Sequence, residues 1–302
     1  MNSFSLSELA SPSPLVAASG CCSFGEHLRR IGQESEFAVI TTDSIAERPQ
    51  GQSVSSFMEY STGLISAVSI GRTNVREFLE TKLPALENCA TPYSVSISGS
   101  SISEYTRIAK ALHGNCNPTY LEVNLSWNNS INEDNSPYAD PASAGTVVAE
   151  IGLSMNYSIP IITKLPWLAN GLTTVVQECV NNGTSAVSLT GSTVGVGLNL
   201  KTLKPALPDS LGIISGPATR PLALKAILET RNAFPDLPLI GGGGVDSGQA
   251  AAQMIAAGAD LVSIGTALLQ DPFAGSRINA EFAKLLTDLH TTYAELKNSA
   301  HF

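Results

Sequence analysis

The chain has 302 residues, of which 43% are hydrophobic, so it can bury a sizeable core and is not a mostly disordered protein. Lysine and arginine number 17 against 26 for aspartate and glutamate, and the net charge of −9 argues against nucleic acid or an anionic membrane as partner. The sequence contains no apolar run of about 18 residues and no Cys/His cluster with zinc-ligand spacing, so we expect no membrane span and no metal site.

The N-terminus lacks the positive region and the long apolar run of a signal peptide. The chain has 5 cysteines, an odd number at irregular spacing, which favours a reducing compartment over a disulfide framework. We therefore expect a cytoplasmic protein.

Short apolar, β-branched runs alternate with stretches of helical periodicity along the chain. The runs predict strands at residues 37–41, 93–98, 120–125, 159–165, 186–189, 237–240 and 261–264. The periodic stretches predict helices at 103–112, 142–155, 173–181, 221–233 and 248–257, and a final amphipathic helix at 278–298. Continuous apolar strands separated by helices indicate a parallel sheet that is buried on both faces.

The number of β–α units predicts the architecture. About seven or eight units fit this length, which matches a single α/β domain with the (β/α)8 TIM-barrel fold better than a two-domain Rossmann enzyme. No GxGxxG follows the first strand, which further disfavours the Rossmann fold. We expect one domain over residues 1–302, with polar rim insertions at about 43–76 and 127–141.

Glycine-rich ends of two consecutive strands carry the sharpest local pattern. The strand at 237–240 runs into four glycines at 241–244, and the strand at 261–264 ends in Gly265-Thr266. Such corners present several backbone N–H groups and a helix N-terminus without side chains in the way, which is what a phosphate needs. The pattern predicts a phosphate site at the last two βα-loops, with a flexible glycine turn as the alternative.

Several segments together resemble the dihydroorotate dehydrogenase family of FMN-dependent barrels. They are PLVAASG at 14–20, FAVIT at 37–41, SVSISGSSIS at 94–103, EVNLS at 122–126, IITKLP at 161–166, LKTLKP at 200–205, SGPA at 215–218, and the block from IGGGGV to IGTAL at 240–268. They occur in the family's order over roughly residues 10 to 275. The resemblance implies a barrel fold, FMN as cofactor, a redox reaction on a small molecule, and a homodimer.

The resemblance also implies which residues contact FMN. Ala18, Ser19 and Gly20 would lie along the isoalloxazine ring and the ribityl chain, and Lys164 near the N1/C2 end of the ring. Ser192, Ser215 and Gly216 would border the ribityl phosphate, and Gly243, Gly244, Gly265 and Thr266 would hold it. Lys164 has an independent rationale, because a lysine that ends an apolar strand is costly unless it meets an anion or a cofactor. An exposed lysine at the strand end is the alternative.

The loop after the strand at 120–125 departs from the family. The family's pattern is Asn-x-Ser-Cys/Ser-Pro-Asn, in which the Cys or Ser removes a proton from the substrate. Here Trp127 occupies that position, and an indole cannot act as a base, whereas Asn124 and Asn129 match two substrate-binding asparagines. If the register is shifted by one or two residues, Ser126 or Ser130 is the base. The candidate catalytic residues are therefore Ser126, Trp127 and Asn129.

Three further positions differ from the family. Val68 and Gly191 stand where the family has asparagines, and Thr42 stands where it has a second lysine. The candidate substrate-binding residues are Asn124, Asn129 and Thr42. Because a site built to hydrogen-bond a polar ring rejects it once the partners are missing, these changes favour a substrate other than dihydroorotate.

Three alternatives to an FMN oxidoreductase with a different substrate stay open. The first is a genuine soluble dihydroorotate dehydrogenase, the second is a flavin-binding protein without turnover, and the third is a non-redox phosphate-binding barrel. Only the last predicts a colourless protein.

Overall fold

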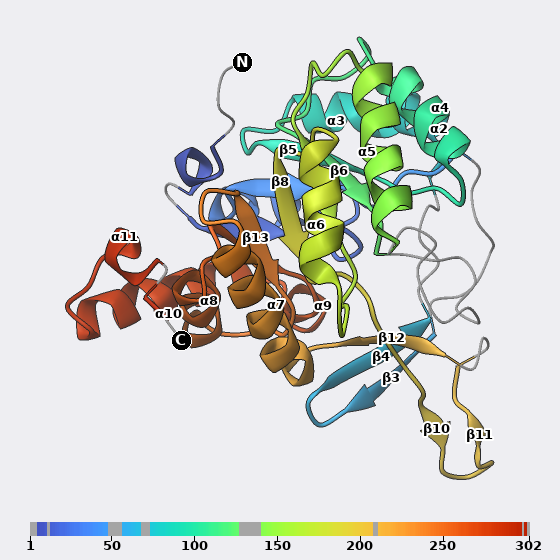
Figure 1. The fold of residues 1–302 in the computed structure, drawn as a ribbon. Helices are drawn as coiled ribbons and strands as arrows, with labels where there is room; N and C mark the ends of the chain where they lie inside the picture. The colour runs from blue at the N-terminus through green and yellow to red at the C-terminus, as the bar shows by residue number, and fades with distance from the viewer. Residues whose placement is uncertain are drawn as a thin grey trace.

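A closed barrel of parallel strands forms the centre of the molecule (Figure 1). The computed structural model describes residues 5–10, 13–47, 56–67, 73–126, 140–207, 211–297 and 299–300. The strands close in the order β1-β14-β13-β8-β7-β6-β5-β2, which confirms the predicted (β/α)8 fold. They are β1 (Leu15–Ala17), β2 (Val39–Thr41), β5 (Tyr93–Ile97), β6 (Leu121–Asn124), β7 (Ile161–Lys164), β8 (Ala186–Leu189), β13 (Leu239–Gly242) and β14 (Leu261–Ile264).

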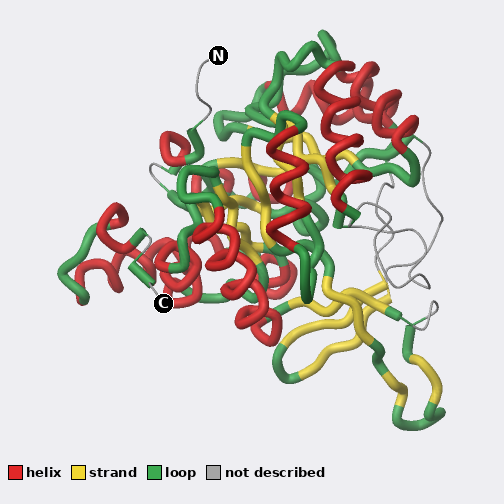
Figure 2. Tube along the Cα trace, in the orientation of Figure 1, coloured by secondary structure: helices red, strands yellow, loops and turns green. Residues whose placement is uncertain are grey.

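Helices surround the barrel, as the red segments around the yellow strands show (Figure 2). The longer ones are α4 (Ile102–Leu112), α5 (Pro141–Ser154), α6 (Leu172–Asn181), α7 (Arg220–Ala233), α8 (Gly248–Ala256) and α10 (Ala274–Asp288). The first five confirm the predicted helices to within one residue at each end. Short helices lie at α1 (Glu26–Arg30), α2 (Val75–Glu77), α3 (Leu83–Glu87), α9 (Thr266–Gln270) and α11 (Tyr293–Leu296), and single turns lie at Ser7–Leu9, Glu34–Glu36, Phe78–Lys82 and Pro217–Thr219.

The prediction of one continuous helix over 278–298 was wrong. Helix α10 begins earlier, at Ala274, and ends at Asp288, and a turn with His290 in the left-handed region (φ 50°) follows it. A second helix, α11, then starts behind Thr292, which forms a capping box with Glu295. The local cap therefore interrupts a stretch whose apolar spacing alone looks continuous.

A small antiparallel sheet and a hairpin lie outside the barrel (Figure 1). The sheet has the order β3-β4-β12-β9, and its strands are β3 (Ser56–Tyr60), β4 (Gly63–Ala67), β9 (Thr193–Gly195) and β12 (Gly212–Ser215). The hairpin consists of β10 (Leu198–Asn199) and β11 (Lys204–Pro205). Strands β3 and β4 fall in the predicted insertion 43–76, whereas the excursion between β8 and α7 was not predicted. Residues 127–139 of the other insertion lie outside the described residues, and the single-domain division stays a prediction.

Apolar side chains of the barrel fill two regions, and a third, small cluster of Ile65, Ala67 and Leu207 lies at the outer sheet. Val16, Val39, Ile162, Ile240 and Leu261 belong to one cluster from five different barrel strands. Their neighbours on the same strands, such as Leu15 and Ile161, belong to a larger cluster that includes the buried faces of the helices. This division follows from the alternation of side chains along a strand, and it explains why the strands read as continuous apolar runs. In the described part of the chain, no helix is both long and apolar enough to cross a membrane.

Asp260 joins four elements at the amino end of the barrel. Its Oδ2 accepts hydrogen bonds from the backbone N–H of Leu239 at 2.8 Å and from Arg231 Nη2 at 3.0 Å. Lys297 Nζ contacts the other carboxylate oxygen, and the Tyr293 hydroxyl donates to the backbone carbonyl. This buried aspartate therefore holds β13, β14, α7 and the C-terminal α11 together.

We expect Asp260→Asn to lower the free energy of unfolding by about 3 kcal/mol, because it leaves the largely buried Arg231 without its charge partner. Urea denaturation followed by circular dichroism measures this change. Asp288→Asn, which removes a largely exposed ion pair with Lys284, is the matched control and should change stability by less than about 1 kcal/mol. Equal losses in the two variants would contradict the role of Asp260.

Candidate functional site

A buried ion pair lies inside the barrel near the carboxyl ends of the strands. Glu122 Oε1 on β6 is 3.6 Å from Lys164 Nζ on β7, and the side chains are only 6% and 16% exposed. Glu122 also accepts a hydrogen bond from Ser96 Oγ on β5 at 2.9 Å. Lys164 is therefore not the exposed strand-end lysine of the alternative interpretation. Its cation is held in a largely desolvated place, beside a carboxylate that offsets part of the cost of burial.

Asn124 lies next to this pair, in register with Lys164 on the neighbouring strand. Its Nδ2 donates to Ser44 Oγ at 3.2 Å, and its Oδ1 accepts hydrogen bonds from the backbone N–H of Ser126 at 3.1 Å and from Ser126 Oγ at 2.5 Å. Both ends of the amide thus have partners, which fixes its orientation. The structure brings Asn124, Ser126 and Lys164 together at one end of the barrel.

Serine hydroxyls connect this group to the first βα-loop. Ser44 Oγ lies 2.8 Å from Ser96 Oγ and 3.4 Å from Ser19 Oγ. Sequence reasoning missed Ser44, Ser96 and Glu122. The signal for Glu122 was present, since an acid in the apolar strand EVN requires a buried partner.

The segment Ala18–Gly20 forms the turn after β1. The N–H of Ala18 donates to Ile264 O at 2.9 Å, and the N–H of Gly20 donates to Asp43 Oδ1 at 3.0 Å. Gly20 has φ 88°, a conformation that glycine adopts without strain. This segment therefore lies between β14 and the loop after β2, with the half-buried Ser19 at its centre.

Thr42 lies on the barrel wall rather than at an open surface. Its side chain is buried, and its Oγ1 accepts a hydrogen bond from the N–H of Ser96 at 3.1 Å. The hydroxyl thus satisfies a backbone donor, and contact with a substrate would require a local rearrangement. The predicted substrate-binding role of Thr42 stays a prediction.

Cys21 follows the Ala18–Gly20 turn and faces the loop after β14. A side-chain carbon added to Gly265 would lie 3.1 Å from Cys21 Sγ. Burial raises the pKa of the Cys21 thiol to about 12, against the opposing influence of the Lys164 cation. The thiol is therefore protonated at neutral pH and is not a ready nucleophile or base.

The two glycine corners carry unpaired backbone donors. Gly243 and Gly244 have φ values of 117° and 71°. Within the described ranges, no atom accepts a hydrogen bond from the N–H of Gly243, Gly244, Gly265 or Thr266. All four residues are partly exposed, and Thr266 begins α9. Unpaired N–H groups at two adjacent strand ends fit the phosphate that the sequence predicts.

The loop that contains Ser215 and Gly216 lies against these corners. A side-chain carbon on Gly244 would be 2.7 Å from Gly216 O, and one on Gly243 would be 3.2 Å from Thr190 Oγ1. Ser192 follows two residues after Thr190, and its carbonyl accepts a hydrogen bond from the N–H of Trp167 at 3.3 Å. The structure thus places the loops of Ser192 and of Ser215 beside Gly243 and Gly244.

Gly191 faces Ser126. A side-chain carbon on Gly191 would lie 2.1 Å from Ser126 Cβ and 2.4 Å from Ser126 Oγ. An asparagine at position 191 is therefore incompatible with the present position of Ser126. Glycine at position 191 thus leaves room for the Ser126 side chain.

Four positions singled out in the sequence lie outside the described residues: Val68, Trp127, Asn129 and Ser130. Their roles stay predictions. Among the residues that the structure describes, no group of three or more His, Cys, Asp or Glu side chains could hold a metal ion, and all five cysteines are free.

Comparison with known proteins identifies relatives over nearly the whole chain. The model of the family described as dihydroorotate dehydrogenase matches residues 2–286. The catalytic subunit of dihydroorotate dehydrogenase B (NAD+) from Geobacter sp. (strain M21) is 32% identical over 276 residues, which cover 91% of this chain and 90% of that protein. The protein of the same name from Citrifermentans bemidjiense is 31% identical over 91% of this chain and 90% of its own length. The one from Geobacillus kaustophilus is 27% identical over 93% of this chain and 89% of its own length.

Proposed function

Because the chain belongs to the dihydroorotate dehydrogenase family, which comprises FMN-dependent enzymes that oxidise a CH–CH bond, we propose that it oxidises dihydroorotate to orotate. The observation that carries the proposal is the pairing of Asn124 with Lys164 at the carboxyl ends of β6 and β7. An oriented amide and a cation at this end of the barrel suit a polar substrate and an anionic reduced flavin. The redox enzyme was predicted from the sequence, but the relatives favour dihydroorotate over the different substrate that was expected first.

We propose that the cofactor lies across the carboxyl ends of the strands. The N–H groups of Gly243, Gly244, Gly265 and Thr266 would bind its phosphate, and Ser192, Ser215 and Gly216 would border the ribityl chain. Ala18, Ser19 and Gly20 would lie along the ring, with Lys164 at its N1/C2 end. When bound, FMN supplies the acceptor of the hydride.

The protein's own groups have to orient the substrate and take up a proton. Asn124 presents a fixed amide for a polar ring, although it already makes three hydrogen bonds within the protein. The Ser126 hydroxyl donates a hydrogen bond to Asn124 Oδ1, and this bond must be replaced if Ser126 is to act as the base. Trp127 and Asn129, in the adjoining loop, stay candidates from the sequence.

One observation favours a second candidate function, the oxidation of a related molecule with fewer hydrogen-bonding groups. Ser126 occupies the space in which an asparagine at position 191 would lie, and Thr42 is buried where the family has a lysine. Both features remove polar partners from the pocket. The names of the relatives give no support to this candidate.

The purified protein should be yellow and release FMN on denaturation, and dihydroorotate should bleach the bound flavin under anaerobic conditions. Dihydrouracil, which lacks the carboxylate, is the control and should react at least about tenfold more slowly, because amide side chains placed to hydrogen-bond the carboxylate would lose their partner. Stopped-flow absorbance measures both rates. A yellow protein that dihydroorotate does not bleach would favour the second candidate, and a protein without FMN would refute both.

Lys164→Met should make the reduction potential of the bound flavin more negative, because the lysine cation stabilises the anionic reduced ring. A shift of roughly 30 mV corresponds to a tenfold change in the two-electron equilibrium. The double variant Lys164→Met/Glu122→Gln controls for the carboxylate that the single change leaves unpaired. If neither variant changes potential or FMN affinity, Lys164 does not lie at the ring.

We also propose that the protein is a homodimer. The hairpin β10–β11 extends away from the barrel (Figure 1), and its turn carries Leu200 and Leu203, which are 86% and 77% exposed. Apolar side chains exposed to this extent on a projecting hairpin are typical of an interface. The sheet next to it adds the exposed Val194.

The double variant Leu200→Ser/Leu203→Ser should therefore shift the sedimentation coefficient from that of a dimer to that of a monomer. Leu153→Ser on α5, where the leucine is 61% exposed, is the control and should leave the association unchanged. A wild-type protein that sediments as a monomer at all accessible concentrations would refute the dimer.

A further inference from the structure

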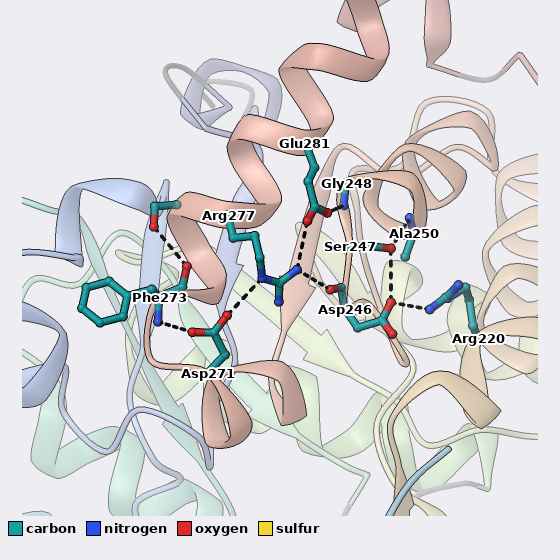
Figure 3. Close-up of polar contacts among 10 residues, drawn as sticks. Arg220, Asp246, Ser247, Gly248, Ala250, Asp271, Phe273, Arg277 and Glu281 are labelled. Carbon is teal, nitrogen blue, oxygen red and sulfur yellow. Dashed lines mark hydrogen bonds and ion pairs between the residues drawn. The ribbon is translucent and has the colours of Figure 1, made fainter. Parts of the chain in front are cut away.

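One row of charged side chains links the loops around the glycine corners (Figure 3). It runs from Arg220, at the start of α7, to Asp246 in the loop before α8, then to Arg277 in α10 and to Asp271. These residues follow β12, β13 and β14, and the ends of β13 and β14 carry the predicted phosphate site. The row therefore connects the loops that follow these three strands.

Arg220 makes the shortest contacts of this row. Its Nε donates to Gly244 O at 2.9 Å, and its Nη2 donates to Asp246 Oδ1 at 2.6 Å. The arginine side chain is 23% exposed, so water screens these contacts only in part. A single guanidinium thus binds both a backbone carbonyl and a carboxylate in the loop that follows β13, a geometry that a lysine ammonium does not reproduce.

The far side of the same loop is held by α10. Arg277 Nη1 donates to the carbonyl of Asp246 at 3.0 Å, and Arg277 Nε donates to Asp271 Oδ2 at 3.0 Å. Glu281 accepts a hydrogen bond from the N–H of Gly248 at 2.7 Å, at the first turn of α8. Asp246 therefore has Arg220 on its carboxylate and Arg277 on its backbone carbonyl.

These contacts restrict a backbone that would otherwise be highly mobile. Gly243 and Gly244 have no side chains to limit their dihedral angles. The contact with Arg220 fixes the direction of the Gly244 carbonyl, and because a peptide unit is planar it also fixes the N–H of Val245 on the opposite side. A donor that is oriented before its ligand arrives binds more tightly, since no ordering cost remains.

We propose that Arg220, together with Asp246, is a positioning residue for the cofactor phosphate. The pair fixes the peptide unit between Gly244 and Val245, and this limits the conformations open to the corner that carries the unpaired N–H groups of Gly243 and Gly244. This inference rests on the proposed placement of the FMN phosphate at these glycines. Arg220 acts through the backbone, because its charge is already neutralised by Asp246.

The two residues allow a test in which positioning and simple charge attraction predict opposite signs. Asp246→Ala removes a negative charge near a dianion, so charge attraction alone predicts tighter FMN binding. Positioning predicts weaker binding, because Arg220 loses one of its two contacts. Arg220→Lys keeps the positive charge, so charge attraction predicts no change, whereas positioning again predicts weaker binding.

The experiment is a fluorescence titration of the flavin-depleted full-length protein with FMN and, separately, with riboflavin, which lacks the phosphate. For Arg220→Lys and Asp246→Ala we expect the Kd of FMN to rise about tenfold while the Kd of riboflavin changes less than about twofold. Lys225→Ala, which removes an exposed ion pair with Glu229 on the same helix, is the control and should change neither. Thermal unfolding of each protein verifies that the variants are folded.

Each remaining outcome decides a different point. If wild-type protein prefers FMN to riboflavin and both variants keep that preference, the positioning role is refuted and the phosphate site stands. If wild-type protein binds the two flavins equally, the placement of the phosphate at these glycines is refuted, and the inference falls with it. Tighter FMN binding by Asp246→Ala refutes positioning and favours charge attraction.

Discussion

Gly216 and Gly244 meet backbone to backbone, and neither position has room for a side chain. A carbon on Gly244 would lie 2.7 Å from Gly216 O, and one on Gly216 would lie 2.6 Å from Gly63 Cα. Three loops from distant parts of the chain, the turn between β3 and β4 and the loops after β12 and β13, can therefore approach only because all three residues are glycines. That approach brings the unpaired N–H groups, the small outer sheet and Arg220 into one corner of the molecule.

The interior of the barrel divides into an apolar end and a polar end. Tyr120 and Leu261 lie at the amino ends of their strands, whereas Asn124 and Lys164 lie at the carboxyl ends of the same barrel. Buried charges are tolerated when they are paired and hydrogen-bonded, and here the pair of Glu122 and Lys164 also faces the place where a charged cofactor is proposed. The proposed reaction thus takes place at the end of the barrel where polar side chains replace apolar ones in the interior.

Sequence patterns predict the parts of this protein that depend on local periodicity. The helices between the apolar runs were placed to within one residue at each end and the runs themselves to within two. The glycine corners were found because their residues are adjacent in the chain. The strand Leu15–Ala17 was not predicted, since three residues carry no periodicity. The polar group in the barrel was also missed, because Ser44, Ser96 and Glu122 are 26 or more positions apart and meet only when the barrel closes. The break between α10 and α11 depends on a cap rather than on hydrophobic spacing.

The position of Asp260 has a consequence for how such a chain diversifies. Its contacts to Arg231, Leu239 and Lys297 lie at the amino end, on the opposite side of the barrel from Asn124 and Lys164. Exchanges at the carboxyl end, such as those at positions 42 and 191, leave these contacts in place. Substitutions near the pocket can therefore accumulate while the opposite end keeps the chain folded.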